Sequence, residues 1–250
     1  MRFELQRADF WKRISAFMFD MIMLVTLAVG IAAIMSAVLK YDSYNENFER
    51  IKSEYYDKYG IDPEIPEDEL TDEQKQAYID ADADFSKDKD AIYNYNMLLN
   101  LTLLILSISV LIAYIALEVV VPYLFKYGRT LGKRIFGLAV MRTNGVKVSG
   151  PVFFVRTVIG KYTMETMVPI YLIIMTIFGS IGSLGLIVIL LLLGLNVFTV
   201  FYTKTRSTIH DLVADTVVVD MASQMIFESE EELIAYKTRI HEEEANKKEY

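Results

Sequence analysis

The chain has 250 residues, of which 53% are hydrophobic, and its formal net charge is −8. This apolar fraction fits a membrane protein with several spans better than a soluble domain. The absence of cysteine excludes disulfides, cysteine zinc sites and thiol chemistry. With only two histidines, a histidine metal cage is also disfavoured, and we expect neither a metal nor a cofactor.

The charge is unevenly distributed along the chain. Residues 41–95 contain 17 acidic and six basic side chains, and residues 221–250 contain eight acidic and four basic ones. The rest of the chain holds eight acidic and 15 basic side chains. Two appendages are therefore acidic while the membrane segments and their loops are basic, so the overall charge describes neither part. We expect no nucleic-acid partner.

Apolar runs predict four transmembrane helices, over residues 14–39, 97–125, 165–180 and 184–203. The first run is too long for a cleaved signal peptide, and no small-residue cleavage site follows it. The stretch 165–203 is too long for one helix and is interrupted at Gly179–Gly185. Basic residues at both of its ends favour a tight hairpin of two helices under the positive-inside rule. A single tilted span is the alternative.

The predicted organisation has seven parts. The first three are an interfacial segment with the first span (1–39), an acidic extracytoplasmic helical hairpin (40–96) and the second span (97–125). Within the hairpin, Thr71 and Gln74 form a capping-box pattern, which predicts the start of a helix that could run into the second span. The remaining parts are a basic cytoplasmic loop (126–164), the third and fourth spans (165–203), a His-Asp motif with a strand (204–222) and a charged cytoplasmic tail (223–250).

Within the basic loop, residues 138–149 alternate around Asn144-Gly145, which predicts a β-hairpin. Thr216–Val219 could add a third strand to it. Residues 151–162 read as an amphipathic helix lying on the membrane, with Arg156 and Lys161 reaching the headgroups. The fold class is thus an all-α membrane protein with four spans, a small cytoplasmic β-hairpin and an outer helical hairpin.

Two carboxylates stand inside the predicted spans. Asp20 follows Arg13 by seven residues, two helical turns, so both lie on one face. A charged side chain at this depth costs roughly 2.5–3.5 kcal/mol on insertion scales, so Asp20 needs a partner. Glu118 lies in the inner half of the second span. Sharing one site, the two carboxylates could bind ions or protons, as cation/proton exchange requires. Alternatively, Asp20 is a structural counter-ion for Arg13, Lys133 or Arg134, and Glu118 reaches the inner surface.

Three motifs follow one another along the chain. An R-x-x-A-x-x-x-D run is formed by Arg13, Ala16 and Asp20. A G-x-T-x-G-K-R-x-x-G-x-x-V run is formed by Gly128, Thr130, Gly132, Lys133, Arg134, Gly137 and Val140. An H-D-x-x-A-x-T-x-V run is formed by His210, Asp211, Ala214, Thr216 and Val218. In this order they resemble the RDD family of membrane proteins, named for one arginine and two aspartates, over residues 5–39 and 97–220.

The resemblance implies that Arg13, Asp20 and Asp211 form the family's charge cluster. Two features depart from the family pattern: the insertion at 41–95 is long, and Asp215 stands where glycine is common, which puts a tight turn there in doubt. The family's implied roles are transport of an ion or small solute, with cation/proton exchange the most concrete version, or a non-transporting role as a membrane adaptor or regulator.

The other motifs give weaker indications of function. Gly128–Lys133 lacks the spacing of a phosphate-binding P-loop, so Lys133 and Arg134 are expected to bind lipid phosphates or inner-face acids. The acidic run from Asp80 lacks the glycine of a calcium loop. His210 could shuttle protons, although a hydrogen-bonding role is the commoner one. We find no support for an enzyme.

The expected location is the cell membrane, as a multi-pass protein with both termini in the cytoplasm. The partners expected are the lipid bilayer and, in the adaptor alternative, a protein docked on the acidic outer hairpin or the tail. A monomeric transporter usually has paired breaks in its helices, and only one glycine-rich break stands in the predicted spans. A homo-oligomer could instead build a shared transport path.

Overall fold

The computed structural model describes residues 5, 8–66 and 69–248, with side chains up to residue 245. It divides into two compact units, Met1–Thr26 with Leu111–Tyr250, and Leu27–Val110. The predicted interfacial segment at residues 1–13 lies partly outside the described residues. The chain is mostly helical, with one small antiparallel sheet in the first unit.

Among the described residues, four helices are long and apolar enough to cross a membrane. The first is α1 (Phe10–Val38), whose start is capped by the Asp9 carboxylate. The second runs through α4 (Lys89–Tyr114), the π-helix η2 (Ile115–Val120) and α5 (Val121–Phe125). Four apolar helices were predicted, and this count is confirmed.

The third long helix differs from the prediction at its start. It runs without interruption through α7 (Gly150–Phe154), the π-helix η3 (Val155–Met167) and α8 (Val168–Ile177). A helix is present at 151–162 as predicted, but it is not a separate element, because it continues directly into the predicted third span. Pro151 begins the helix in its first turn, where a missing N–H costs nothing, and nothing breaks the helix before Gly179.

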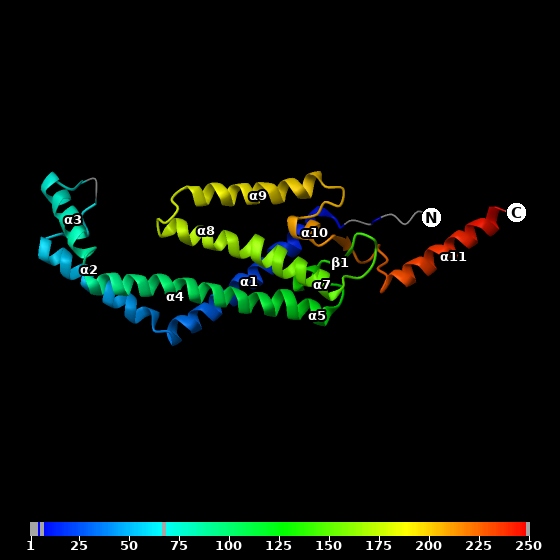
Figure 1. The fold of residues 1–250 in the computed structure, drawn as a ribbon, viewed down its shortest axis with the longest axis horizontal. Helices are drawn as coiled ribbons and strands as arrows, with labels where there is room; N and C mark the ends of the chain where they lie inside the picture. The colour runs from blue at the N-terminus through cyan, green and yellow to red at the C-terminus, as the bar shows by residue number, and fades with distance from the viewer. Residues whose placement is uncertain (1–4, 6–7, 67–68, 249–250) are drawn as a thin grey trace. The chain divides into compact units, whose positions relative to one another are not determined.

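The fourth long helix is α9 (Leu184–Tyr202), which runs alongside α8 in Figure 1. The turn between them uses Gly179 and Gly182, whose φ angles of 70° and 54° are left-handed. At Gly185 a Cβ would meet the Thr176 hydroxyl and lie 3.1 Å from the Leu172 carbonyl oxygen. Two helices in a tight hairpin, and not one tilted helix, occupy this stretch.

The sheet pairs strand β1 (Leu138–Arg142) with strand β2 (Thr216–Asp220). The predicted hairpin forms its turn, because Gly145 N–H donates to Arg142 O at 2.9 Å. Its second arm is reduced to one bridge between Met141 and Lys147. The Lys147 N–H turns instead to Phe227 O at 2.8 Å, so the predicted third strand is the main partner of β1.

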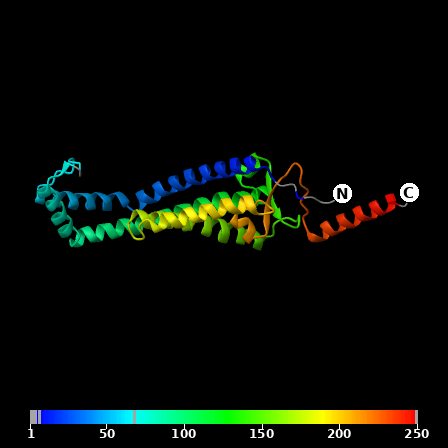
Figure 2. The ribbon, with the colours of Figure 1, turned by 90° about the horizontal axis from the view of Figure 1, so that it is seen from above.

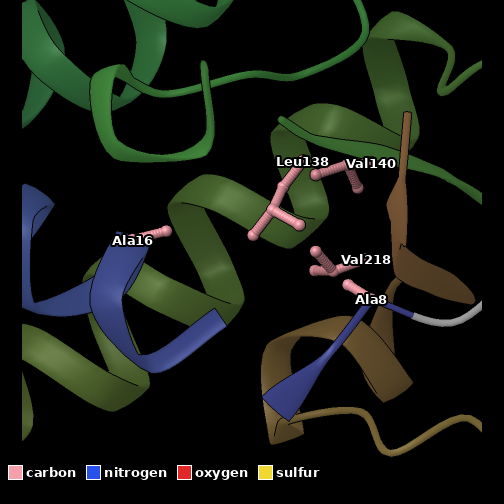
Figure 3. Close-up of a cluster of buried hydrophobic side chains, with 5 residues drawn as sticks. All are labelled: Ala8, Ala16, Leu138, Val140 and Val218. Carbon is pink, nitrogen blue, oxygen red and sulfur yellow. The ribbon is translucent and has the colours of Figure 1, made fainter. Parts of the chain in front are cut away.

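Both faces of this sheet are buried. Leu138, Val140 and Val218 point from the strands toward Ala8 and Ala16 of the N-terminal part, as Figure 3 shows. The opposite face consists of Ala139, Met141, Val217 and Val219. Burial on both sides explains why β2 reads as an unbroken Val-Val-Val run and not as an alternating strand.

Two short helices flank the sheet, α6 (Leu131–Ile135) before β1 and α10 (Ile209–Val213) before β2. The tight turn before β2 is present although glycine is replaced by Asp215, whose φ is 50°. Aspartate tolerates this region better than most residues, and the Thr143 hydroxyl donates to its carboxylate at 2.6 Å.

The second unit contains α2 (Tyr41–Tyr59) and α3 (Asp72–Phe85). The capping box at Thr71 is confirmed, with its hydroxyl accepting from Gln74 N. The predicted run from this helix into the next span is wrong. The helix α3 ends at Phe85, and α4 begins after the non-helical residues Ser86–Asp88. The Asp88 carboxylate caps the start of α4 by accepting hydrogen bonds from two backbone N–H groups.

After the sheet comes α11 (Glu230–Lys248), which extends away from it as a single helix in Figure 2. Its first turns are attached through Leu233 and Tyr236, which pack with Phe227 and Val146. An ion pair between Lys147 and Glu228, at 2.7 Å, stands at the same place. The tail is therefore a charged helix, as predicted.

Candidate functional site

Asp20 lies in α1 with only 8% of its surface exposed, and it is bound by a loop. Its Oδ2 accepts a hydrogen bond from the Thr130 hydroxyl, and its Oδ1 accepts one from Gly132 N–H at 2.7 Å. A Cβ at Gly132 would collide with the Ala16 carbonyl oxygen and lie 3.0 Å from the Asp20 carboxyl carbon. The threonine and glycine of the loop motif thus supply one donor each, and only glycine permits this approach.

These donors are uncharged, which differs from the expected charge cluster. Among the described residues, no lysine, arginine or histidine nitrogen lies within 4.0 Å of the Asp20 carboxylate. Arg13 turns to other acceptors: it donates to the Arg206 carbonyl oxygen and lies 3.7 Å from Asp211 Oδ2. Arg13 and Asp211 are brought together, and Asp20 stands apart from them.

Asp211 is 1% exposed and accepts hydrogen bonds from three side chains, besides its contact with Arg13. Arg156 Nε donates to its Oδ1 at 2.9 Å, and the hydroxyls of Thr208 and Thr216 each donate at 3.1 Å. Burial by itself would raise the pKa of Asp211, but the nearby charges of Arg156 and Arg13 outweigh burial and hold that pKa well below its usual range. The Asp211 carboxylate therefore joins α1, η3 and β2.

His210 lies beside this pair. Its Nε2 is 3.1 Å from Arg156 Nη2, and its Nδ1 is 2.7 Å from Glu165 Oε2. Because a guanidinium only donates, Nε2 accepts from Arg156 and Nδ1 carries the proton given to Glu165. At Gly160 a Cβ would lie 2.6 Å from the His210 Cβ, so this glycine lets α10 pack on η3.

Glu118 and Lys161 form a second buried ion pair. Glu118 is 4% exposed and lies in the π-helix η2, and Lys161 lies in the π-helix η3. Next to them the Tyr114 hydroxyl donates to the Thr157 carbonyl oxygen at 2.8 Å. Two π-helical segments of the second and third long helices therefore face each other through opposite charges. Asp20 and Glu118 do not share one set of ligands.

Lys133 and Arg134, adjacent in the basic loop, point to different surroundings. Lys133 is half-buried, and its Nζ reaches the Thr130 hydroxyl at 3.4 Å. Burial lowers the pKa of Lys133, and the charges of Lys161 and Arg156 lower it further, to about 8, against the opposite effect of Glu118 and Asp20. Arg134 is exposed and lies over the Phe125 ring, 4.0 Å from its centroid.

Comparison with known proteins identifies the group to which this arrangement belongs. The model of the RDD family matches residues 7–215. The chain belongs to the RDD family. No curated protein and no solved structure matches the chain. The match spans the first two motifs and, of the third, His210, Asp211 and Ala214.

In this RDD protein, the buried contacts involve residues that sequence reasoning assigned elsewhere or missed. Arg156 and Lys161 were expected at the headgroups, and Glu165 was not considered. Arg156 is instead 3% exposed. One signal was available: Gly160 follows Arg156 by one helical turn, and a small residue beside a charge on one helix face marks a close approach.

No metal site stands among these groups. Within the part of the chain that the structure describes, no group of three or more His, Cys, Asp or Glu side chains is arranged to hold a metal ion. The RDD site is thus a network of direct ion pairs and hydrogen bonds between α1, the second and third long helices, and the two short helices.

Proposed function

We propose that this RDD family protein exchanges a monovalent cation for protons across the membrane, with the Glu118–Lys161 pair as the ion-binding centre. The observation that carries the proposal is the position of this pair in two facing π-helices, η2 and η3. π-Helical turns are rare and are frequently found at functional sites. A buried ion pair is also a weak means of joining two helices, because desolvation can exceed the Coulombic gain.

The chemistry follows from competition for one carboxylate. Glu118 attracts Lys161 directly, and the charges of Lys133 and Arg156 also act on it. A cation that loses part of its hydration shell can replace the Lys161 ammonium at the carboxylate oxygens. Because three basic side chains surround this single carboxylate, the local field disfavours divalent cations and favours an ion with one charge.

The other charged groups are given supporting roles. Asp20 anchors the α6 loop to α1 through Thr130 and Gly132, and so positions Lys133. Arg13, Arg156 and Asp211 join α1 to η3 and α10. This assigns to Glu118 the ion-binding role that the sequence reasoning shared between Glu118 and Asp20.

We propose that both termini lie in the cytoplasm of a cell-membrane protein. Residues 126–149 contain six basic and no acidic side chains, which favours the cytoplasmic side by the positive-inside rule. An even number of spans then puts both ends there and the acidic α2–α3 pair outside. Because the chain has no cysteine, single cysteines at Asn144 and Ser53 can be labelled cleanly in whole cells. An impermeant maleimide should label Ser53→Cys and spare Asn144→Cys; the reverse pattern contradicts this orientation.

The exchange itself is tested with the purified full chain in liposomes that contain a pH-sensitive dye. An imposed pH gradient should be dissipated on addition of Na⁺ or K⁺, and not of choline, in parent liposomes. Glu118→Gln should abolish this signal, whereas Arg134→Gln, at an exposed cation outside the buried network, should retain it. Parent liposomes that respond no more than empty ones would exclude cation exchange.

A second candidate is a non-transporting adaptor or regulator. The observation that favours it is α11, in which Ile234 is 62% exposed on a charged helix attached to the sheet. Its test is removal of residues 230–250. If a protein that co-purifies with the parent is lost while the thermal stability of the bundle is unchanged, and parent liposomes show no exchange, the adaptor role is supported. Unchanged co-purification counts against the tail as the docking site.

A further inference from the structure

We propose that Lys133 is the proton-releasing group of the exchange centre: its ammonium gives up a proton when a monovalent cation binds at Glu118. The inference rests on the proposed exchange function and adds a residue that the ion-binding pair alone does not include. It assigns the two halves of the exchange to different groups, with the cation held by carboxylate oxygens and the proton held by a lysine nitrogen.

The first argument is position. Thr130 caps α6 and accepts from Lys133 N at 3.4 Å, while its own hydroxyl donates to Asp20. The Lys133 Nζ lies 3.4 Å from the same hydroxyl oxygen. One threonine therefore links the ammonium to the Asp20 carboxylate. The Asp20 anchor fixes this short helix against α1, so the backbone of Lys133 has little freedom to move.

The second argument is the lack of a direct counter-ion. Among the described residues, no carboxylate oxygen lies within 4.0 Å of Lys133 Nζ, whereas Lys161 has Glu118 in contact. An ammonium has three donors, and one acceptor is present for Lys133. A half-buried ammonium without a carboxylate in contact is the cation of this network that loses least by becoming neutral.

The third argument is the surrounding charge. Four ionisable groups act on Lys133: Asp20 from α1, Glu118 from η2, and Arg156 and Lys161 from η3. Burial and the two cations outweigh the two acids, and the pKa of Lys133 falls to about 8. Lys133 is therefore protonated at neutral pH but close to release.

The exchange step is balanced. A cation that arrives beside Glu118 adds one positive charge to the field at Lys133, which lowers the pKa of Lys133 further. One N–H bond of the ammonium breaks, its electron pair stays on Nζ, and the proton leaves to water. The net charge of the centre is the same before and after, so the low-dielectric site never holds an extra charge.

The first test measures the titration of Lys133 in the full chain. Lysine amines are labelled with ¹³C-methyl groups, the protein is placed in lipid nanodiscs, and the resonance missing from Lys133→Arg is assigned to Lys133. Its midpoint should lie near pH 8 in choline chloride and at a lower pH in NaCl or KCl of equal ionic strength. A midpoint near 10.5, the ordinary lysine value, or one that is insensitive to the cation, overturns the inference.

The second test measures exchange against pH. Lys133→Arg keeps the positive charge but cannot release it, so the cation-dependent flux per folded protein at pH 8 should fall by about tenfold or more. Arg134→Lys, the matched control at the neighbouring exposed position, should keep the parent profile. An unchanged pH profile in Lys133→Arg contradicts the role even if the parent transports.

The two tests separate the inference from the function on which it rests. If parent liposomes show no exchange but Lys133 titrates near pH 8 with a midpoint that Na⁺ or K⁺ lowers, transport is excluded and the linkage between cation and proton at this site stands. If the parent exchanges ions and Lys133 titrates as an ordinary lysine, exchange stands and another group releases the proton.

Discussion

Asp20 and Glu118 are both carboxylates buried in long apolar helices, yet the protein satisfies them in different ways. Asp20 accepts hydrogen bonds from the hydroxyl of Thr130 and the N–H of Gly132, both part of one loop. Glu118 faces the ammonium of Lys161 on another long helix. One carboxylate is held by neutral donors and the other by a movable charge.

The kind of partner determines what each carboxylate can do. Neutral donors fixed on a backbone cannot leave without moving the loop, so the Asp20 contact suits an anchor. A lysine ammonium stands on a flexible four-carbon chain and can move away from its partner, so the Glu118 contact is compatible with exchange of an ion at the carboxylate. Depth in the membrane alone, which made both residues candidates in the sequence, does not separate an anchor from an exchange site.

The largest expected effect is on the Glu118 side. Lys161→Met leaves a buried carboxylate without its counter-ion, and removal of one partner of a buried pair costs about 3–5 kcal/mol. Thermal unfolding of the full chain in detergent should show a large loss of stability. The double variant Glu118→Leu/Lys161→Met should recover most of it, because replacing both charges by apolar groups is often neutral. Equal stability of Lys161→Met and the parent would mean that this ion pair is not formed.

A smaller effect is expected on the Asp20 side. In Gly132→Ala the new methyl group meets the backbone oxygen of Ala16, so α6 must shift, and overpacking of this kind costs about 1–3 kcal/mol. Gly194→Ala is the matched control, because a Cβ there has no atom within 4 Å. It should leave stability unchanged or raise it by up to about 1 kcal/mol. If both variants unfold like the parent, the loop does not approach α1 as closely as the Asp20 anchor requires.

The smallest expected effect is on the pH dependence of the free energy of unfolding. Because the folded pKa of Lys133 is lowered to about 8 from 10.5, the unfolded chain binds more protons than the folded one between these two values. The contribution of Lys133 to the free energy of unfolding therefore rises with pH from 8 to 10.5. Comparison of unfolding temperatures at pH 7.5 and 9.5 should show a smaller rise with pH in Lys133→Met than in the parent. An identical rise would show that Lys133 titrates normally.

Features set by local chemistry could be predicted from the sequence. The four apolar helices, the capping box at Thr71 and the glycine turn near Gly179 depend on residues close together in the chain. The predicted turn at Gly145 is also present, but the strand before it, β1, pairs with β2 and not with the residues after the turn. The Thr216–Asp220 strand fits between two apolar layers, and the residues after Gly145 are drawn to Phe227 instead.

The site itself could be predicted only in part. The three motif charges were identifiable, and the contact between Arg13 and Asp211 joins two of them. The hydrogen-bond donors of Asp20 could not be identified from the sequence, because Thr130 and Gly132 lie 110 and 112 residues away from it. Arg13, Lys133 and Arg134 were equally plausible partners for this carboxylate. Neither π-helix has a sequence signature, so the pairing of Glu118 with Lys161 depends on a backbone geometry that only the fold supplies.

The most direct measurement compares the two carboxylates in one assay. Asp20→Asn and Glu118→Gln are reconstituted at equal amounts of folded protein, and the Na⁺- or K⁺-dependent dissipation of a pH gradient is recorded for each. Asn can still accept from Gly132 N–H and donate to the Thr130 oxygen, so Asp20→Asn should keep flux within about twofold of the parent, with some loss of stability. Glu118→Gln should show no flux above empty liposomes. Loss of flux in Asp20→Asn with parent-like flux in Glu118→Gln would contradict the assignment of anchor and exchange site.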